Sequence, residues 1–268
     1  MSAGAPHRQR SAKHRLRVAT GVLPGLSEAE AVVWVEGEEA HHAARVLRVR
    51  AGEGVRLMDG RGWEADAEVA EAASGRVGCR VTGGLRCLER VRPRVTVVAP
   101  AAKGSRGDEM ADQMAQAGAD RWVVLSSERS VVEPGAGKLA KWRRRSEEAS
   151  KQCGRAWDLA VAGPVSFAEA VSWAAGEGVA GWLMDVGEGA APNRSLRSQL
   201  AWRHQPQGEL EEVMVLVGPE GGWTDGERSA ALAAGWRAWT VGRYVMRLET
   251  AAVVGAAMLA TGVHSTDG

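Results

Sequence analysis

One turn in the second half of the chain has residue types suited to holding a small ligand. Gly218–Gly222 reads Gly-Pro-Glu-Gly-Gly, follows the apolar run Val213–Val217, and precedes Thr224 and Glu227, which have the spacing of a helix capping box. In open α/β sheets, ligands bind beyond the carboxyl ends of strands, and glycine allows close approach to the backbone. The spacing fits neither a dinucleotide fingerprint nor a phosphate-binding loop, so another ligand class is indicated.

A second segment, Val241–Ala251, also connects an apolar run to a helical pattern. It carries Arg243, Arg247 and Glu249. Guanidinium groups stabilise oxygen atoms that gain negative charge during a reaction, and a nearby carboxylate can orient them. The alternative interpretation is structural: solvated arginines, and a glutamate favoured by the dipole in the first turn of a helix.

From Arg94 onward, apolar runs alternate with helical periods, which predicts an α/β domain with a mainly parallel sheet. The last helix, 250–259, contains no charged residue and should be buried on most sides. The expected strands are 95–99, 122–125, 181–184, 213–217 and 238–241, and the expected helices are 109–117, 139–153, one starting at 224, and 250–259.

The segment Val18–Leu88 has a different sequence pattern, in which short runs of alternating apolar and polar residues are interrupted by glycine. This pattern is typical of a small β-barrel or sandwich. A short polar joint with a proline follows near residue 90. We therefore expect a basic tail over 1–16, a β domain over 17–89 and the α/β domain over 93–264.

The composition is that of a globular protein, with 45% hydrophobic and 25% charged residues among 268 and a net charge of +1. The three widely spaced cysteines, Cys79, Cys87 and Cys153, argue against a disulfide framework or a zinc site, and we expect reduced, mostly buried thiols. The N-terminus has no apolar signal core, and no run has the length of a membrane helix. These features predict a cytoplasmic protein with no membrane association.

Basic residues gather in three clusters, although the net charge is near zero. They lie at Arg8–Arg17, at Arg45–Arg50, and at Lys138–Arg145, and none of the three contains an acidic residue. A single cluster of this kind is commonly a solvated surface, whereas three together favour RNA as the partner. The adjacent His41 and His42 would point apart, so we expect RNA contact there and no metal site.

The order of these motifs resembles the RsmE-type ribosomal RNA methyltransferases of the SPOUT superfamily. The Gly-Pro-Glu-Gly-Gly turn followed by Gly-Arg-x-x-Met-Arg-x-Glu-Thr-Ala at Gly242–Ala251 is the most specific match. Lys103-Gly104-x-Arg106, Ser127–Ser130 and Glu148–Arg155 agree in order, and the resemblance covers about residues 17 to 262.

The resemblance implies a PUA-like β-barrel domain followed by a SPOUT α/β methyltransferase domain with a C-terminal trefoil knot. It implies a homodimer that binds S-adenosyl-L-methionine in the knot, needs no metal, and methylates N3 of one uridine in the 16S ribosomal RNA of the small ribosomal subunit.

It also assigns roles to residues. Arg247 or Arg155 would stabilise the uracil imidate, with Glu220 or Glu249 orienting an arginine. The cofactor would contact Met184, Val217, Gly218, Pro219, Glu220, Gly221, Val241, Gly242, Val245, Met246 and Leu248. RNA would contact His42, Arg45, Arg48, Lys103, Arg106, Arg129, Arg143 and Arg243.

The sequence departs from the family pattern in the helix after Arg106, where Gln113 and Gln116 stand in place of a lysine and a glutamate. Leu248 replaces a usual threonine. Two alternatives therefore stay open: a PUA-like RNA-binding or ribosome-assembly protein that has lost catalysis, and a SPOUT methyltransferase that acts on another RNA site, such as a ribose oxygen.

Overall fold

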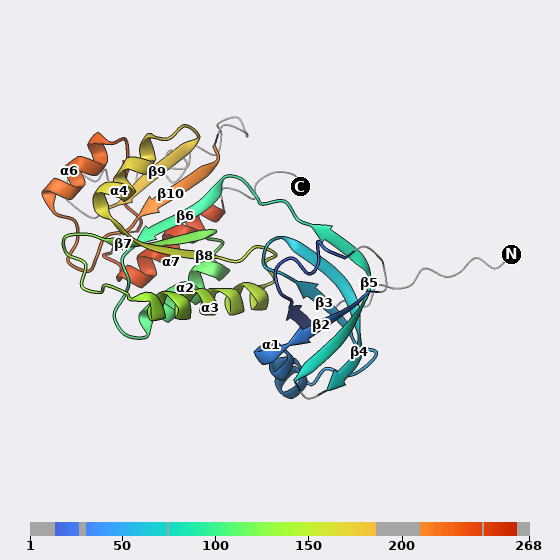
Figure 1. Cartoon of the computed structure of the whole chain (residues 1–268). Helices are drawn as coiled ribbons and strands as arrows, with labels where there is room; N and C mark the ends of the chain where they lie inside the picture. Colours follow the sequence, from blue (N-terminus) through green and yellow to red (C-terminus); the bar gives the residue numbers. More distant parts are fainter. Residues whose placement is uncertain (1–13, 27–30, 74, 186–209, 243, 262–268) are drawn as a thin grey trace. The chain divides into compact units, whose positions relative to one another are not determined.

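The computed structural model describes residues 14–26, 31–73, 75–185, 210–242 and 244–261 (Figure 1). The chain divides into two compact units. The first comprises Met1–Glu89 with Lys151–Trp157, and the second comprises Arg90–Ser150 with Asp158–Gly268.

The first unit is built on a five-stranded sheet in the order β1-β3-β4-β5-β2. Its strands are β1 (His14–Arg17), β2 (Val32–Glu36), β3 (Gly54–Met58), β4 (Trp63–Ala73) and β5 (Arg76–Cys87). β1 pairs with β3 in parallel and the other pairs are antiparallel, with register shifts between β4 and β5 that bend the sheet. The result is a mixed, curled sheet, which confirms the predicted small β domain.

β1 corrects one expectation about the N-terminus. Residues 14–16 were predicted to belong to a basic tail, but His14–Arg17 pairs in register with Val55–Met58. The apolar side chain responsible is Leu16, which is fully buried in the core of the first unit. A single buried leucine among basic residues is a weak signal of a strand, so the pattern was missed.

A short helical segment follows β2 and carries one of the predicted basic clusters. α1 (Gly37–His42) continues into a π-helical turn, η1 (Ala43–Leu47), and Arg48 then adopts a left-handed conformation with φ 53°. Ala40 and Ala43 anchor this segment in the core.

The second unit contains a six-stranded parallel sheet in the order β11-β9-β10-β6-β7-β8. The strands are β6 (Arg94–Ala99), β7 (Arg121–Ser126), β8 (Ala160–Ser166), β9 (Val179–Met184), β10 (Glu212–Leu216) and β11 (Arg237–Trp239). The predicted α/β architecture is therefore confirmed.

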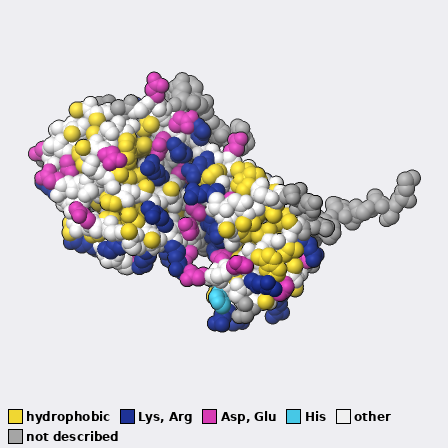
Figure 2. All heavy atoms as spheres, viewed as in Figure 1, with side chains coloured by type: hydrophobic (Ala, Val, Ile, Leu, Met, Phe, Trp, Pro, Cys, Tyr) yellow, Lys and Arg dark blue, Asp and Glu magenta, His cyan; other side chains and the backbone are white. Residues whose placement is uncertain are grey.

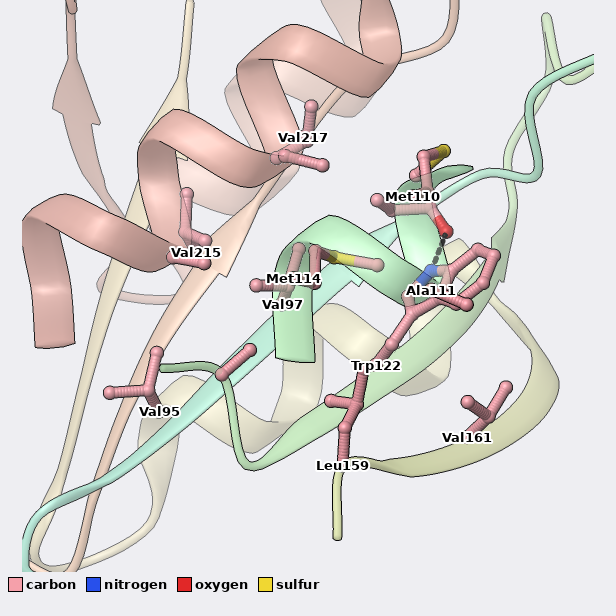
Figure 3. Close-up of a cluster of buried hydrophobic side chains, with 14 of the residues drawn as sticks. Val95, Val97, Met110, Ala111, Met114, Trp122, Leu159, Val161, Val215 and Val217 are labelled. Atoms are coloured by element: carbon pink, nitrogen blue, oxygen red, sulfur yellow. Dashed lines mark hydrogen bonds between the residues drawn. The ribbon is translucent and has the colours of Figure 1, made fainter. Parts of the chain in front are cut away.

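Helices cover both faces of this sheet, which explains why its strands are apolar on both sides. α2 (Arg106–Gln116), α3 (Ala136–Cys153) and α7 (Leu248–Ala260) supply one face, and α4 (Phe167–Ser172), η2 (Trp173–Ala175) and α6 (Asp225–Ala233) supply the other. Figure 3 shows the first of these cores, where Val97 of β6, Met114 of α2 and Trp122 of β7 lie together.

The strand β8 and the helix α4 were not predicted. β8 lies at the edge of the sheet and contains Gly163-Pro164, a pair that normally marks a turn. The register with β7 shifts between Val123 and Leu125, and an edge strand with such an irregularity tolerates proline.

The cysteines correct another expectation. Cys79 is buried, and burial raises the pKa of its thiol to about 11, but Cys87 and Cys153 are exposed. All three are free thiols. In the described part of the chain, no helix combines the length and apolarity needed to span a membrane.

Candidate functional site

The ends of β9, β10 and β11 meet at one edge of the parallel sheet. Leu183 pairs with Leu216, and Met184 pairs with Trp239. The backbone N–H of Asp185 donates to the carbonyl of Trp239 at 3.1 Å. The segments that follow these three strands therefore start side by side, and they include the cofactor-contact residues predicted from the sequence.

Two glycines of the turn Gly218–Gly222 pack closely against the protein's own side chains, and a third has a left-handed backbone conformation. A Cβ on Gly218 would lie 3.1 Å from the Trp223 ring, and a Cβ on Gly221 would lie 3.3 Å from the Arg129 side chain. Gly222 has φ +69°, and its N–H donates to the carbonyl of Pro219 at 2.9 Å. The sequence suggests that these glycines make room for a ligand, and the structure adds that Gly218 and Gly221 pack closely against a tryptophan and an arginine.

Trp223 and Arg129 were not recognised as parts of this edge. The indole N–H of Trp223 donates to the carbonyl of Met184 at 2.9 Å, which joins the turn after β10 to the end of β9. The Arg129 guanidinium donates to the carbonyl of Gly221 at 2.8 Å. Arg129 was predicted to contact RNA, and no sequence pattern indicated this internal contact.

The second predicted segment runs from Val241 to the start of α7. Gly242 has φ +79°, which is a left-handed conformation that favours glycine. Val245 is 79% exposed and Met246 is half-buried, whereas Leu248 is buried in the core. The backbone N–H groups of Gly242, Val245 and Met246 donate to no other described residue. Arg243 lies outside the described residues.

One guanidinium and two carboxylates form a charged cluster at the same edge. Arg106, the first residue of α2, donates to both carboxylate oxygens of Glu249 at 3.3 Å and lies 3.7 Å from Glu220. The sequence predicted that Glu220 or Glu249 would orient an arginine, and the structure places both carboxylates beside Arg106. The family motif contained all of these residues, although only the fold could pair them.

Arg247 and Arg155, the two arginines predicted to act in catalysis, belong to different units of the chain. Arg247 is the N-cap residue of α7 and is exposed, and its side chain does not cap the helix. Arg155 lies in Lys151–Trp157, which groups with the first unit, and its Nε donates to the carbonyl of Trp157 at 3.2 Å. Arg247 and Glu249 are therefore the predicted catalytic residues that the second unit places beside its strand ends.

Three of the five basic side chains in the cluster at Lys138–Arg145 form ion pairs. Lys141 contacts Asp108 at 2.6 Å, Arg145 contacts Asp112 at 3.3 Å, and Arg144 contacts Glu148 at 3.4 Å. Arg143 donates through Nε to the carbonyl of Val161 at the edge strand β8. The acidic partners on α2 are remote in sequence, which is why the cluster looked unopposed. Figure 2 shows basic side chains beside acidic ones on the visible face.

Several other residues that were predicted to contact RNA have exposed, charged side chains. Arg45 and Arg48 are exposed at η1, with the half-buried His42 just before it, and Lys103 is exposed ahead of α2. Gln113 and Gln116 are also exposed, and Gln116 donates to Asp112 of its own helix at 2.8 Å. Among the described residues, no group of three or more His, Cys, Asp and Glu side chains could hold a metal ion.

The fold and this edge define a class of protein. Residues 90–260 match the model of an RNA methyltransferase domain, and residues 35–81 match that of an RNA methyltransferase PUA domain. A solved ribosomal RNA small subunit methyltransferase E from Neisseria gonorrhoeae, bound to S-adenosyl methionine, superposes with a TM-score of 0.76 at 24% identity, over 92% of this chain and 97% of that one. A Legionella pneumophila methyltransferase structure with bound SAM has a TM-score of 0.72 at 25% identity, over 91% and 96% of the two chains.

Curated relatives identify the family more narrowly. The Mycobacterium bovis ribosomal RNA small subunit methyltransferase E is 34% identical over 235 residues, which are 85% of this chain and 86% of the relative. The Synechocystis relative of the same name is 31% identical over 237 residues, or 86% and 73% of the two chains. The chain belongs to the ribosomal RNA small subunit methyltransferase E family, as its motifs suggested.

Proposed function

We propose that this protein transfers a methyl group from S-adenosyl-L-methionine to N3 of one uridine in 16S ribosomal RNA. Its family membership makes it an S-adenosylmethionine-dependent ribosomal RNA methyltransferase. The observation that carries the proposal is the convergence of three strand ends with the charged cluster of Arg106, Glu220 and Glu249. The choice of uridine N3 rests on the family resemblance.

The residues at this edge fit an adenosine-containing ligand with a charged amino acid part. Val245 presents an exposed apolar side chain, and the neighbouring N–H groups of Val245 and Met246 donate to no other described residue. Backbone donors that bond to no other described residue, next to apolar side chains, suit a flat, hydrogen-bonding ring. We assign cofactor contact to residues at three strand ends: Met184, Val217, Gly218, Pro219, Glu220, Gly221, Val241, Gly242, Val245, Met246 and Leu248.

When bound, S-adenosylmethionine supplies a methyl group on a positively charged sulfur. The uracil N3–H is a weak acid, and its proton must leave as N3 becomes the nucleophile. Negative charge then develops on the two uracil oxygens. Preorganised positive groups stabilise such charge without a cost of reorganisation.

The protein supplies those positive groups around the start of α7. Arg247 is exposed there, and its side chain leaves the first N–H groups of the helix uncapped. A helix N-terminus favours negative charge. We assign imidate stabilisation to Arg247 and assign to Glu249 and Glu220 the holding of Arg106. We keep Arg155, which groups with the first unit, as the alternative residue for imidate stabilisation.

RNA recognition is assigned to residues 17–89, and the reaction to residues 93–264. Arg45 and Arg48 offer exposed charge on one short helical segment, where phosphate contacts would position the RNA. We also assign RNA contact to His42, Lys103, Arg129, Arg143 and Arg243, of which Arg129 and Arg143 already have partners in the protein.

A trefoil knot and a homodimer complete the proposal. α7 packs tightly, because a Cβ on Gly255 would lie 3.2 Å from Val215 and 3.3 Å from Met184. Helices of small residues allow such close approach, as a knotted chain end requires. The half-exposed apolar side chains of Val253, Val254 and Met258 are suited to contact with a second copy. The connection 186–209 lies outside the described residues.

The test is methylation in a purified system. Small ribosomal subunits from a strain that lacks the gene are incubated with the protein and isotopically labelled S-adenosylmethionine, and the RNA nucleosides are identified by mass spectrometry. We expect one labelled 3-methyluridine. A label on a ribose would contradict the uridine N3 assignment, and an absence of label with a folded protein would favour the noncatalytic RNA-binding alternative.

A further inference from the structure

A tryptophan links two of the loops that form the proposed cofactor site. The Trp223 indole donates to the carbonyl of Met184 at the end of β9, and its ring lies over Gly218 at the end of β10. Phe167 packs against the same ring at a centroid distance of 5.6 Å. Trp223 therefore fixes the turn after β10 relative to the end of β9.

An arginine supports the other side of the same turn. The Arg129 guanidinium donates to the carbonyl of Gly221 at 2.8 Å and to that of Trp223 at 3.4 Å. The aliphatic part of Arg129 packs where a Cβ of Gly221 would lie. One side chain therefore orients the peptide groups that follow Gly221 and Trp223, and it leaves little room for a Cβ at Gly221.

The segment that carries Arg129 is itself firmly held. Ser127 and Ser130 close a turn, in which the Ser127 N–H donates to the Ser130 hydroxyl at 2.9 Å and the two hydroxyls lie 2.8 Å apart. The N–H of Glu128 donates to the buried carboxylate of Glu227 at 2.9 Å. Glu227 also completes the capping box with Thr224 at the start of α6. Arg129 thus extends from a rigid support.

We propose that Trp223 and Arg129 are positioning residues that preorganise the turn Gly218–Gly222 for cofactor binding. This inference rests on the proposed function, because it concerns the same site. Besides Trp223 and Arg129, Arg106 lies 3.7 Å from Glu220 of the turn, and the N–H of Gly222 donates to Pro219. The N–H of Val217, just before the turn, donates to Val98. When a loop becomes ordered only on binding, the entropy it loses lowers the affinity for the ligand. Removal of the contacts made by Trp223 or Arg129 should therefore weaken cofactor binding.

The test compares two tryptophans with similar hydrogen bonds. Trp223→Phe keeps an aromatic ring over Gly218 but removes the donor to Met184. Trp236→Phe is the matched control, because the Trp236 indole donates to the carbonyl of Val171 at 2.9 Å on the same face of the sheet and belongs to the core. Affinity for S-adenosylmethionine is measured by titration calorimetry, and thermal unfolding is measured in the absence of cofactor.

We expect the loss of one hydrogen bond to a carbonyl at the site to weaken S-adenosylmethionine binding by Trp223→Phe about tenfold. The KM for S-adenosylmethionine should rise similarly, with a smaller change in kcat at saturating cofactor. Trp236→Phe should lower the melting temperature and leave the dissociation constant unchanged. Equal affinities of Trp223→Phe and the wild type, or equal losses in both variants, would overturn the inference.

Arg129 offers a second, independent comparison. Arg129→Ala should weaken cofactor binding severalfold, and Arg129→Lys should restore part of the loss, because an ammonium group can still donate to the carbonyl of Gly221. An Arg129→Ala variant with wild-type affinity would remove Arg129 from the role. A wild-type protein that binds no S-adenosylmethionine would instead contradict the proposed function, so the two failures are distinguishable.

Discussion

Two glycine-containing turns of this protein are stabilised in different ways. The turn between β3 and β4 is held from within, because the buried carboxylate of Asp59 accepts hydrogen bonds from the N–H groups of Arg61 at 2.7 Å and Trp63 at 3.1 Å. The turn Gly218–Gly222 is held partly from outside, by Arg129 and by Trp223, whose indole bonds to Met184. A turn with local bonds depends on its own residues, whereas a turn braced from a distance depends on the rest of the domain.

The two turns differ in what their loss should affect: stability for the first and function for the second. The Asp59 turn contributes to the first unit's sheet, and its loss should affect folding. The edge of the second unit holds polar groups in position at the surface, and changes there should affect binding and turnover more than folding. The predictions below test this separation, starting with the largest expected effect.

Asp59→Ala should lower the free energy of unfolding by about 3 kcal/mol, since it leaves two backbone donors without their acceptor. Urea denaturation measures the change. Asp59→Asn is the control, because it keeps one carbonyl oxygen and replaces Oδ2, which has no hydrogen-bond partner among the described residues. Equal losses in both variants would show that the carboxylate charge, and not the turn geometry, is what stabilises the unit.

Arg247→Ala should reduce methyl transfer about a hundredfold, the scale expected when one group that stabilises developing charge is removed. Binding of S-adenosylmethionine and the free energy of unfolding should stay near wild type, because the side chain is exposed. Single-turnover kinetics and calorimetry give the two readouts. Full turnover in this variant would exclude Arg247 from the reaction.

Arg106→Ala should reduce kcat/KM about tenfold by leaving Glu249 and Glu220 without the guanidinium that holds them. Arg106→Lys should restore little, since one ammonium group cannot contact Glu249 and Glu220 together, as the two guanidinium nitrogens Nη1 and Nη2 do. Steady-state kinetics with small subunits measure both. If the RNA affinity of Arg106→Ala depends on salt as in the wild type, Arg106 acts by holding the two glutamates. If that affinity depends less on salt while turnover stays normal, Arg106 contacts a phosphate, as the sequence predicted.

Lys141→Ala should change the free energy of unfolding by less than about 1 kcal/mol, because exposed ion pairs contribute little. Its contact with Asp108 at 2.6 Å is at the surface, where the lysine side chain is 68% exposed. RNA affinity should also change little, since the charge is already balanced. A marked loss of RNA affinity would show that this cluster binds RNA despite its acidic partners.

The difference between the two turns also explains what the sequence could predict. Asp-Gly at residues 59–60 is a local turn signal, and Thr224 with Glu227 is a local capping signal, and the structure confirms both. The parallel sheet could also be predicted from local sequence, because a strand that is buried on both faces consists mainly of apolar residues.

The side chains that contact one another within the site are brought together by the tertiary fold, and no local sequence pattern indicates these pairs. Arg106 and Glu249 are 143 residues apart in sequence, and Arg129 and Gly221 are 92 apart. The motifs located these residues but not their pairing, so Arg106 and Arg129 were both assigned to RNA. The ion pairs of Lys141 and Arg145 could not be foreseen for the same reason, since Asp108 and Asp112 lie on another helix.

The most direct test of the central claim is reverse transcription on 16S ribosomal RNA from a strain that lacks the gene and from the same strain complemented with it. A methyl group on N3 blocks Watson–Crick pairing and stops the polymerase. We predict one strong stop at a uridine in the complemented strain, absent from the deletion strain and absent with Arg247→Ala. A stop that persists in the deletion strain, or complementation that restores none, would contradict the claim.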